Sequence, residues 1–501
     1  MQDEREVLFN PHDILDMALP NIQVMKRISL TLFFCSILLL VVAKRLNAQN
    51  LISYDSIIHN LASDFETPGI ALAIMDNYEF DEYLYGYSNI ESGRVVTEKT
   101  LFNVASISKI ITALSVLQLV DKGKLDLDVP IKTYLKSWQP RDTSFDTNKV
   151  TTRRVLNHSA GFSREFGPGF SKTDSLISLT DILSGKSVKR QPLKLVYEPG
   201  SQHLYSNMGY GLLQLLVEDI NGVPFKEYVK KNIFAPLKMS NSTFQDPLLI
   251  NESLDLATPY NHLLEPQEQE RFVVVSAAGL ISNLRDLELL LFEETKEKKL
   301  LSKSNYEQLI NYDDKNAYGL GHILSFNENE IAFIGHTGLG MGWNSSFQFI
   351  SDAGKGIIVL TNGDNGYYIH NTLVCYWYYT ETGKRIKSCN VALNKKLNRV
   401  ELLIEIAVVL EQLKVDDVEK YFLQINQLRN DLEQDNINSF SQKILELKNE
   451  LNTVLSEEIV TLENLPPQII PLIPNGNIKD EINIQFESLT EWLNLTWADD
   501  K

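Results

Sequence analysis

The chain has 501 residues, of which 44% are hydrophobic and 22% charged, and its formal net charge is −18 at pH 7. This composition is ordinary for a soluble globular protein, and the length favours two domains or one large domain with an appendage. The acidic balance argues against nucleic acid as a partner and against binding to an anionic membrane through a basic surface. The eight histidines are scattered, with no H-E-x-x-H or C-x-x-C motif, so we expect neither a metal site nor a cofactor.

The amino terminus has the plan of a secretory signal. A basic start at Met25-Lys26-Arg27 precedes an apolar run over 28–43, and the small residue Ala48 follows. The run is short for a membrane span, which needs about 20 residues. We therefore predict that 1–48 form an extension and a cleaved signal peptide, which makes the protein secreted or periplasmic. The alternative is an uncleaved anchor that tethers the protein to a membrane through residues 28–43.

Three cysteines occur, and Cys35 lies within the apolar run. Outside the cytoplasm the other two, Cys375 and Cys389, can pair and close a short loop, or both can remain buried free thiols. The sequence leaves both alternatives open.

Strands are predicted near both ends of the main domain, which we place at 49–390. The expected strands are 69–75, 82–87, 318–324, 331–334, 345–350 and 356–360. The chain between them is mainly helical and loop-rich, with frequent Pro and Gly. This order predicts an α+β fold, in which one antiparallel sheet is built from both halves of the chain and a helical subdomain is inserted. We expect the functional site at that junction, with the loops 163–195 and 250–275 shaping its pocket.

Ser106 and Lys109 form an S-x-x-K motif that occurs once in the chain. Serine is a poor nucleophile until a base removes its proton, and a lysine one helical turn later lies within reach of the hydroxyl. The apolar run over 110–120 predicts a buried helix with Ser106 at its N-terminus, where free N–H groups and the helix dipole favour negative charge. The motif therefore predicts acyl transfer to Ser106.

Tyr205-Ser206-Asn207 lies about a hundred residues further on, after a Pro-Gly loop. A phenol near an ammonium can take the serine proton and later return it to the leaving group. Asn207 can donate to a substrate carbonyl while holding the lysine. The alternative is a surface loop tyrosine. A second copy, Tyr87-Ser88-Asn89, lies at a predicted strand end, where we do not expect it in the cleft.

His336-Thr337-Gly338 closes the predicted strand at 331–335. A strand edge can align an extended substrate by backbone hydrogen bonds, and a glycine lets the chain approach the acyl group closely. The N–H of Leu339, together with that of Ser106, would form an oxyanion hole worth about 3–4 kcal/mol. The alternative is a β-turn in which Gly338 and Gly340 serve geometry only.

These motifs, together with similar stretches at 154–162, 198–213, 233–239 and 277–282, resemble the serine β-lactamase-related family. That family includes class C β-lactamases, D-Ala-D-Ala carboxypeptidases, D-aminopeptidases and family VIII esterases. The resemblance covers roughly 52–385. It implies the penicillin-recognising fold and an acyl-enzyme on Ser106, with Lys109 and Tyr205 sharing the proton transfers and either of them serving as the base.

One position departs from the class C pattern. Those β-lactamases carry a lysine where this chain has His336, and the histidine version is more similar to D,D-peptidases. A neutral imidazole supplies less fixed charge for a substrate carboxylate, which argues against efficient β-lactam hydrolysis. His158, in the stretch Leu-Asn-His-Ser-Ala-Gly, is expected to be structural.

The tail over 391–501 lies outside the resemblance and is predicted as a mainly helical C-terminal domain. Residues 400–415 are strongly apolar, and 418–432 and 440–455 are amphipathic. We expect a small helical bundle that caps the main domain. The alternative is a module that binds a protein partner or another copy of the chain.

Taken together, the motifs predict an exported serine hydrolase that acts through an acyl-enzyme on a small peptide, amide, ester or lactam. Peptides of D-amino acids rank first among its expected substrates, ahead of β-lactams and short esters. The predicted catalytic residues are Ser106, Lys109 and Tyr205, and the predicted substrate-binding residues are Asn207, His336, Thr337, Gly338 and Leu339. The alternatives are a low-turnover scaffold that works through its tail and a membrane-tethered β-lactam sensor.

Overall fold

The computed structural model describes residues 53–141, 144–163, 169–186, 192–251, 254–311, 317–327 and 330–384, together with the single residues 424, 443 and 446. The chain divides into two units after Asn60. The boundary falls inside the first described helix, α2 (Tyr54–Asp64). The second unit holds the sheet and all the predicted site residues.

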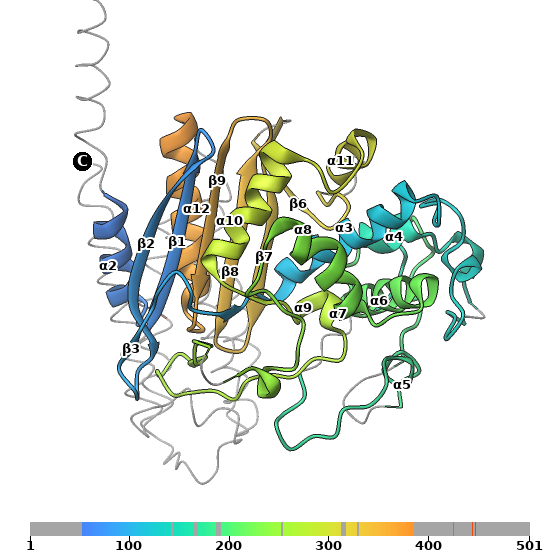
Figure 1. Ribbon diagram of the computed structural model, residues 1–501, viewed down its shortest axis with the longest axis horizontal. Helices are drawn as coiled ribbons and strands as arrows, with labels where there is room; N and C mark the ends of the chain where they lie inside the picture. Colours follow the sequence, from blue (N-terminus) through green and yellow to red (C-terminus); the bar gives the residue numbers. More distant parts are fainter. Residues whose placement is uncertain are drawn as a thin grey trace, which may run out of the picture. The chain divides into compact units, whose positions relative to one another are not determined.

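A seven-stranded sheet, ordered β3-β2-β1-β9-β8-β7-β6, forms the centre of this second unit (Figure 1). Its strands are β1 (Gly69–Asp76), β2 (Glu79–Asn89), β3 (Arg94–Val95), β6 (Ile323–Asn327), β7 (Glu330–Gly340), β8 (Trp343–Ile350) and β9 (Lys355–Thr361). All neighbours pair antiparallel. The two halves of the chain meet where β1 pairs with β9, with Ala73 opposite Ile358. The predicted α+β fold, with one sheet built from both halves, is therefore confirmed.

Two strand predictions need correction. The strand expected at 318–324 begins only at Ile323. Gly321 adopts a φ of +79°, which is not an extended conformation, so the residues before Ile323 do not continue the strand. His336-Thr337-Gly338 lies inside β7 and neither follows the strand nor forms a β-turn. The extension exists because His336 pairs with Phe347 of β8, and the turn Met341-Gly342 closes that hairpin. Cross-strand pairing thus overrides the weak strand propensity of the glycines.

Helices cover both faces of the sheet. α10 (Leu284–Phe292) packs on β1 and β9, and α12 (Gly366–Thr382) packs on β8 and β9 (Figure 1). Leu291 of α10 lies over Gly356 and Trp377 of α12 contacts Phe333. Gly356 and Phe333 point to opposite faces, as the register through Phe349 shows.

A helical group lies beside the end of the sheet that is formed by β7 and β6 (Figure 1). It consists of α3 (Ser108–Asp121), α4 (Thr152–Leu156), α5 (Leu179–Leu183), α6 (Asn207–Asn221), α7 (Phe225–Val229), α8 (Ala235–Leu237), α9 (Val275–Ala278) and α11 (Lys303–Leu309). A short ladder of β4 (Phe102–Asn103) and β5 (Ile281–Ser282) forms a second, two-stranded sheet. This is the predicted helical insertion. The helix α3 is buried on all sides from Ser108 to Leu119, as its apolar sequence predicts.

Several predictions fall outside the described residues. These are the signal or anchor over 28–43, the cleavage after Ala48, and the helical domain over 391–501. Cys375 in α12 is disulfide-bonded, and both other cysteines, Cys35 and Cys389, lie outside the described part of the chain. Within the described ranges, no helix is both long enough and apolar enough to cross a bilayer.

Candidate active site

Ser106 occupies a strained turn that leads directly into α3. It is the central residue of a 3₁₀ turn, η1 (Ala105–Ile107), and Ala105 adopts a φ of +44°, which an L-residue other than glycine rarely does. Two side chains hold the turn. Asn103 Oδ1 accepts from the Ala105 N–H at 2.8 Å, and Ser108 Oγ donates to the Ala105 carbonyl at 2.5 Å. The Ser106 side chain remains half-buried between them.

Lys109 lies beneath Ser106 and is completely buried. Its Nζ lies 3.0 Å from Ser106 Oγ, 2.8 Å from Asn207 Oδ1 and 2.8 Å from the Ala277 carbonyl. Burial lowers the pKa of this ammonium well below its usual range. A neutral amine has two N–H donors and one lone pair. Because the Asn207 and Ala277 oxygens accept, they take the two donors and leave the lone pair for the Ser106 hydroxyl.

Tyr205 approaches the same serine oxygen from the loop that precedes α6. Its hydroxyl donates to Ser106 Oγ at 3.0 Å, and Lys109 Nζ lies 4.8 Å from its ring centroid. Ser206 caps α6 by accepting from the Gly209 N–H at 3.1 Å, and this cap fixes the residues on either side of it. The structure thus brings Ser106, Lys109, Tyr205 and Asn207 together from two distant segments.

Strand β7 lies against the nucleophile turn. A Cβ placed on Gly338 would lie 2.2 Å from the Val104 carbonyl oxygen and 2.3 Å from Ser345 Oγ, so only glycine fits there. Strand β6 pairs with β7 only as far as Gly335, so within the described residues no strand pairs with His336 to Gly340 on that side. Thr337 is half-buried and Leu339 is 48% exposed, as an edge open to substrate requires.

His336 does not face the substrate as a charged group. Its ring is buried, Nδ1 lies 2.5 Å from the Thr337 carbonyl oxygen, and Nε2 lies 2.8 Å from the Tyr318 hydroxyl. Nδ1 therefore carries the proton and Nε2 accepts from Tyr318. Burial, followed by the nearby Lys109, holds the pKa of His336 well below its usual range. The imidazole is thus neutral, and it lacks the fixed positive charge of the lysine that class C β-lactamases carry at this position.

His158 supports the tyrosine loop. Its Nδ1 accepts from the Ser206 N–H at 3.1 Å, and its ring centroid lies 4.3 Å from that of Tyr205. Burial lowers its pKa well below the usual range, and Lys109 adds to this effect. These contacts agree with the structural role expected of this residue.

Sequence reasoning missed several contacts of the site. Asn103 holds the nucleophile turn, Ala277 binds the lysine, and Tyr318 fixes the histidine tautomer. A backbone acceptor such as Ala277 leaves no mark on side-chain patterns. Tyr318 lies in the predicted strand 318–324, and the two glycines of its Tyr-Gly-Leu-Gly context are the local sign of a bend.

A pocket adjoins the nucleophile turn and encloses about 520 Å³ of space, open solvent at its mouth included. It is lined by Asn103, Ala105, Asn207, Glu270, Phe272, Val274, Ala277, Ala278, Leu339, Gly340 and Trp343. Loops, α9 and β7 all contribute to this lining. Among the described residues, no three potential metal ligands come together, here or elsewhere.

The Beta-lactamase family model matches residues 55–371, which hold every element of this site. This chain belongs to the Beta-lactamase family. The family is one of serine hydrolases, and its members similar to this chain include proteins named penicillin-binding protein and D-alanyl-D-alanine carboxypeptidase.

Similarity to individual family members is low. Penicillin-binding protein 4* of Bacillus subtilis (strain 168) is 24% identical over 327 residues, which are 61% of this chain and 70% of that protein. A protein of Escherichia coli O157:H7, provisionally named a D-alanyl-D-alanine carboxypeptidase, is 28% identical over 301 residues, 57% of this chain and 63% of its own length.

Solved structures show the same fold. The octameric penicillin-binding protein homologue from Pyrococcus abyssi superimposes with a TM-score of 0.56 at 24% identity, covering 69% of this chain and 80% of its own. The penicillin binding protein from Bacillus halodurans gives a TM-score of 0.53 at 23% identity, covering 64% of this chain and 99% of its own. The sheet and helical insertion described above are thus those of the family.

Proposed function

We propose that this protein is an exported serine hydrolase that forms and hydrolyses an acyl-enzyme on Ser106. One observation carries the proposal. Ser106 Oγ lies 3.0 Å from both the buried Lys109 amine and the Tyr205 hydroxyl. This places a base and an acid on the same nucleophile, as acyl transfer requires. Export is supported by the basic, apolar and small residues of the N-terminal segment.

Lys109 is the better candidate for the base. Burial lowers its pKa well below the usual range and so favours the neutral amine, and its nitrogen lies 3.0 Å from Ser106 Oγ. As the serine oxygen attacks the carbonyl carbon, its proton passes to Lys109. Tyr205 gives its hydroxyl proton to the leaving nitrogen or oxygen, and the lysine ammonium returns a proton to the phenolate. Water then attacks the ester carbonyl, and its proton follows the same groups in reverse.

The developing oxyanion needs donors that are already in place. The N–H groups of Ser106 and Leu339 are the proposed donors. The lack of a side chain at Gly338 lets β7 lie directly against the nucleophile turn, so the two backbone segments are close together. Thr337 and the edge of β7 from His336 to Gly340 would align the rest of the substrate by hydrogen bonds. Asn207 holds the lysine through its oxygen, which leaves its amide N–H groups for the substrate.

Small peptides or amides of D-amino acids rank first as substrates, supported by the names of the relatives. Short esters and β-lactams follow. The neutral His336 offers no fixed positive charge to a β-lactam carboxylate. The ranking can be measured with a D-Ala-D-Ala peptide, p-nitrophenyl butyrate and nitrocefin.

The test is covalent labelling of the purified protein with a fluorophosphonate and a fluorescent penicillin, followed by intact mass measurement. We expect the fluorophosphonate to add to one residue and Ser106→Ala to abolish this addition at an unchanged Tm. Ser351→Ala, in the exposed turn between β8 and β9, is the matched control and should label as the native protein does. Undiminished labelling of Ser106→Ala would refute the assignment of the nucleophile.

A further inference from the structure

The ionisable groups that line the pocket beside Ser106 are of one sign, negative. Among the residues that line it, Glu270 is the one with an ionisable side chain. Asn103 and Asn207 are the neutral polar members, and Phe272 and Trp343 contribute aromatic surface. Glu270 is half-buried at the wall of this mostly apolar pocket, so its negative charge favours a ligand of opposite charge there.

Glu270 is held in place but keeps hydrogen-bonding capacity free. Its Oε1 accepts from the Gly169 N–H at 2.7 Å, and the carboxylate makes no ion pair within the described chain. The flanking backbone is fixed, because Phe170 and Arg271 exchange N–H···O bonds of 2.8 and 2.9 Å. Since a carboxylate accepts at both oxygens, Oε2 remains available to a ligand.

The basic groups next to Glu270 are occupied elsewhere. The adjacent Arg271 forms an ion pair with Asp246 at 2.7 Å and also donates to the Asp174 carbonyl at 3.0 Å. Lys172 forms an ion pair with Glu268 at 3.0 Å. Neither of these two cations neutralises Glu270, and among the described residues its negative charge in the pocket is not balanced by an ion pair.

The site offers no described cation to a substrate carboxylate. Lys109 donates to Asn207 and Ala277, and its nitrogen also contacts Ser106 Oγ at 3.0 Å, so all of its near neighbours are groups of the site itself. His336 is buried, neutral and bonded at both ring nitrogens. Electrostatics within the described residues therefore disfavour a substrate that ends in a carboxylate near the scissile bond, and favour one that carries an ammonium.

We propose that Glu270 is a specificity residue that binds the ammonium group of a substrate with a free amino end, such as an amino acid amide or a short peptide cleaved at its N-terminal residue. This inference rests on the proposed acyl-enzyme chemistry at Ser106 and names its substrate class. It departs from the carboxypeptidase names of the relatives, whose substrate end is a carboxylate. Glu270 takes no part in the proton transfers.

The test compares three p-nitroanilides of alanine, in both enantiomers, that differ only at the nitrogen: the free amine, the N-acetyl compound and the N-succinyl compound. The expected order of kcat/KM at pH 7 is amine, then acetyl, then succinyl, with at least a tenfold step between amine and acetyl. An α-ammonium loses its proton near pH 7.7–8.0, so the ratio of amine to acetyl turnover should fall above pH 8.

Variants assign the preference to one residue. Glu270→Gln keeps the oxygen that accepts from Gly169 and removes the charge, and it should reduce the amine-to-acetyl ratio of kcat/KM at least tenfold. Glu270→Lys should favour the succinyl compound. Glu268→Gln makes the same change in net charge two residues away, where the native side chain pairs with Lys172, and should leave the ratio unaltered.

The outcomes separate the two proposals. Fluorophosphonate labelling of Ser106 with no turnover of the free-amine compound, or with a ratio that Glu270→Gln does not change, would overturn this inference and leave the nucleophile assignment intact. Loss of Ser106-dependent labelling would overturn both. A preference for the amine that disappears in Glu270→Gln alone would establish the subsite.

Discussion

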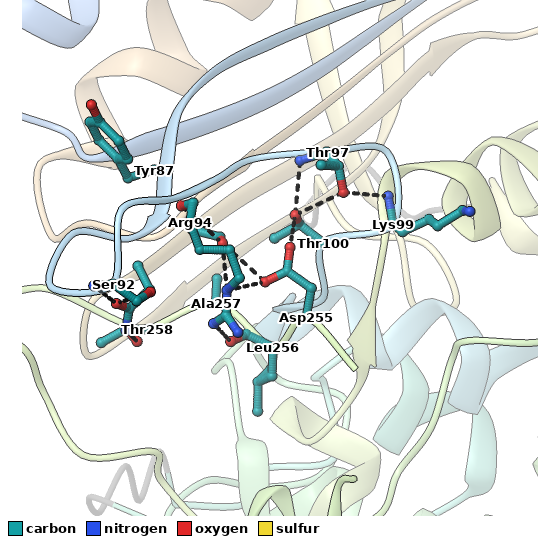
Figure 2. Close-up of polar contacts among 12 residues, drawn as sticks. Tyr87, Ser92, Arg94, Thr97, Lys99, Thr100, Asp255, Leu256, Ala257 and Thr258 are labelled. Carbon is teal, nitrogen blue, oxygen red and sulfur yellow. Dashed lines mark hydrogen bonds and ion pairs between the residues drawn. The ribbon is translucent and has the colours of Figure 1, made fainter. Parts of the chain in front are cut away.

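Tyr205-Ser206-Asn207 and Tyr87-Ser88-Asn89 share three letters but have different surroundings. In the first, the tyrosine hydroxyl donates to Ser106 and the asparagine oxygen accepts from Lys109. In the second, Tyr87 is 47% exposed at the end of β2 and points away from the polar cluster that holds its neighbour Ser88 (Figure 2).

The second triplet belongs to a partly buried structural network away from Ser106. Ser88 Oγ donates to Asp255 at 3.0 Å and accepts from Arg94 at 3.1 Å, and Arg94 pairs with Asp255 at 2.7 Å (Figure 2). Asn89 donates to Thr258 at 2.7 Å. These contacts join β2 to the loop over 254–258. The comparison teaches that a buried amine beside the triplet, and not the triplet itself, makes its groups chemically useful.

The largest difference is expected at the tyrosines. Tyr205→Phe removes the hydroxyl that donates to Ser106, and kcat/KM for a p-nitrophenyl ester should fall by about 10²–10⁴-fold, as for loss of a general acid. Tyr87→Phe removes a hydroxyl from an exposed ring and should stay within about twofold of the native rate. Equal rates for both variants, measured at matched Tm, would mean that Tyr205 has no chemical role.

The asparagines test the state of Lys109. Asn207→Asp keeps an oxygen near the lysine amine and adds a negative charge, which raises the pKa of Lys109. A base acts only when unprotonated, so the ascending limb of the kcat/KM–pH profile should move to higher pH. Activity near pH 7 should fall about 10–100-fold and recover as the pH rises.

Asn89→Asp is the control for this shift, because Asn89 bonds to Thr258 and Ser92 at the end of β2. Its pH profile should overlay that of the native protein. A profile that keeps its position in Asn207→Asp would argue against Lys109 as the base.

The serines give the smallest effects. Ser206 caps α6 and donates to the Ser163 carbonyl at 2.8 Å, so Ser206→Ala should lower the free energy of unfolding by about 1–2 kcal/mol and also reduce activity. Ser88→Ala should cost about 1 kcal/mol and leave activity unaltered. Urea unfolding and rates per folded molecule measure both quantities. Reduced activity in both variants would mean that the network around Ser88 also supports the site.

The sequence predicted most strongly what depends on local pattern. The buried strands β1 and β9 were expected because their apolar runs are continuous, and α3 because it is apolar on all sides. The order of the motifs also predicted that the segments carrying Ser106 and Tyr205 meet in one site. Contacts that depend on three-dimensional approach were missed, such as the Ala277 carbonyl at Lys109 and the Tyr318 hydroxyl at His336.

The residues that line the pocket could not be predicted from local sequence patterns. The loop over 250–275 was expected to shape it, but no local rule marks Glu270 as the member that lines the cavity. Its position depends on the bridge between Phe170 and Arg271, two segments about a hundred residues apart. Long-range backbone pairing of this kind leaves no periodic signal in the chain.

The pairing of β1 with β9 also sets the order in which the molecule can assemble. Ile70 lies opposite Thr361, so the ribosome must make nearly the whole family domain before the central pair of strands can join. Until then β7, the strand beside Ser106, belongs to a sheet whose two halves are not yet joined. Such distant pairing slows folding. We therefore expect the serine to become reactive only after β1 and β9 have paired.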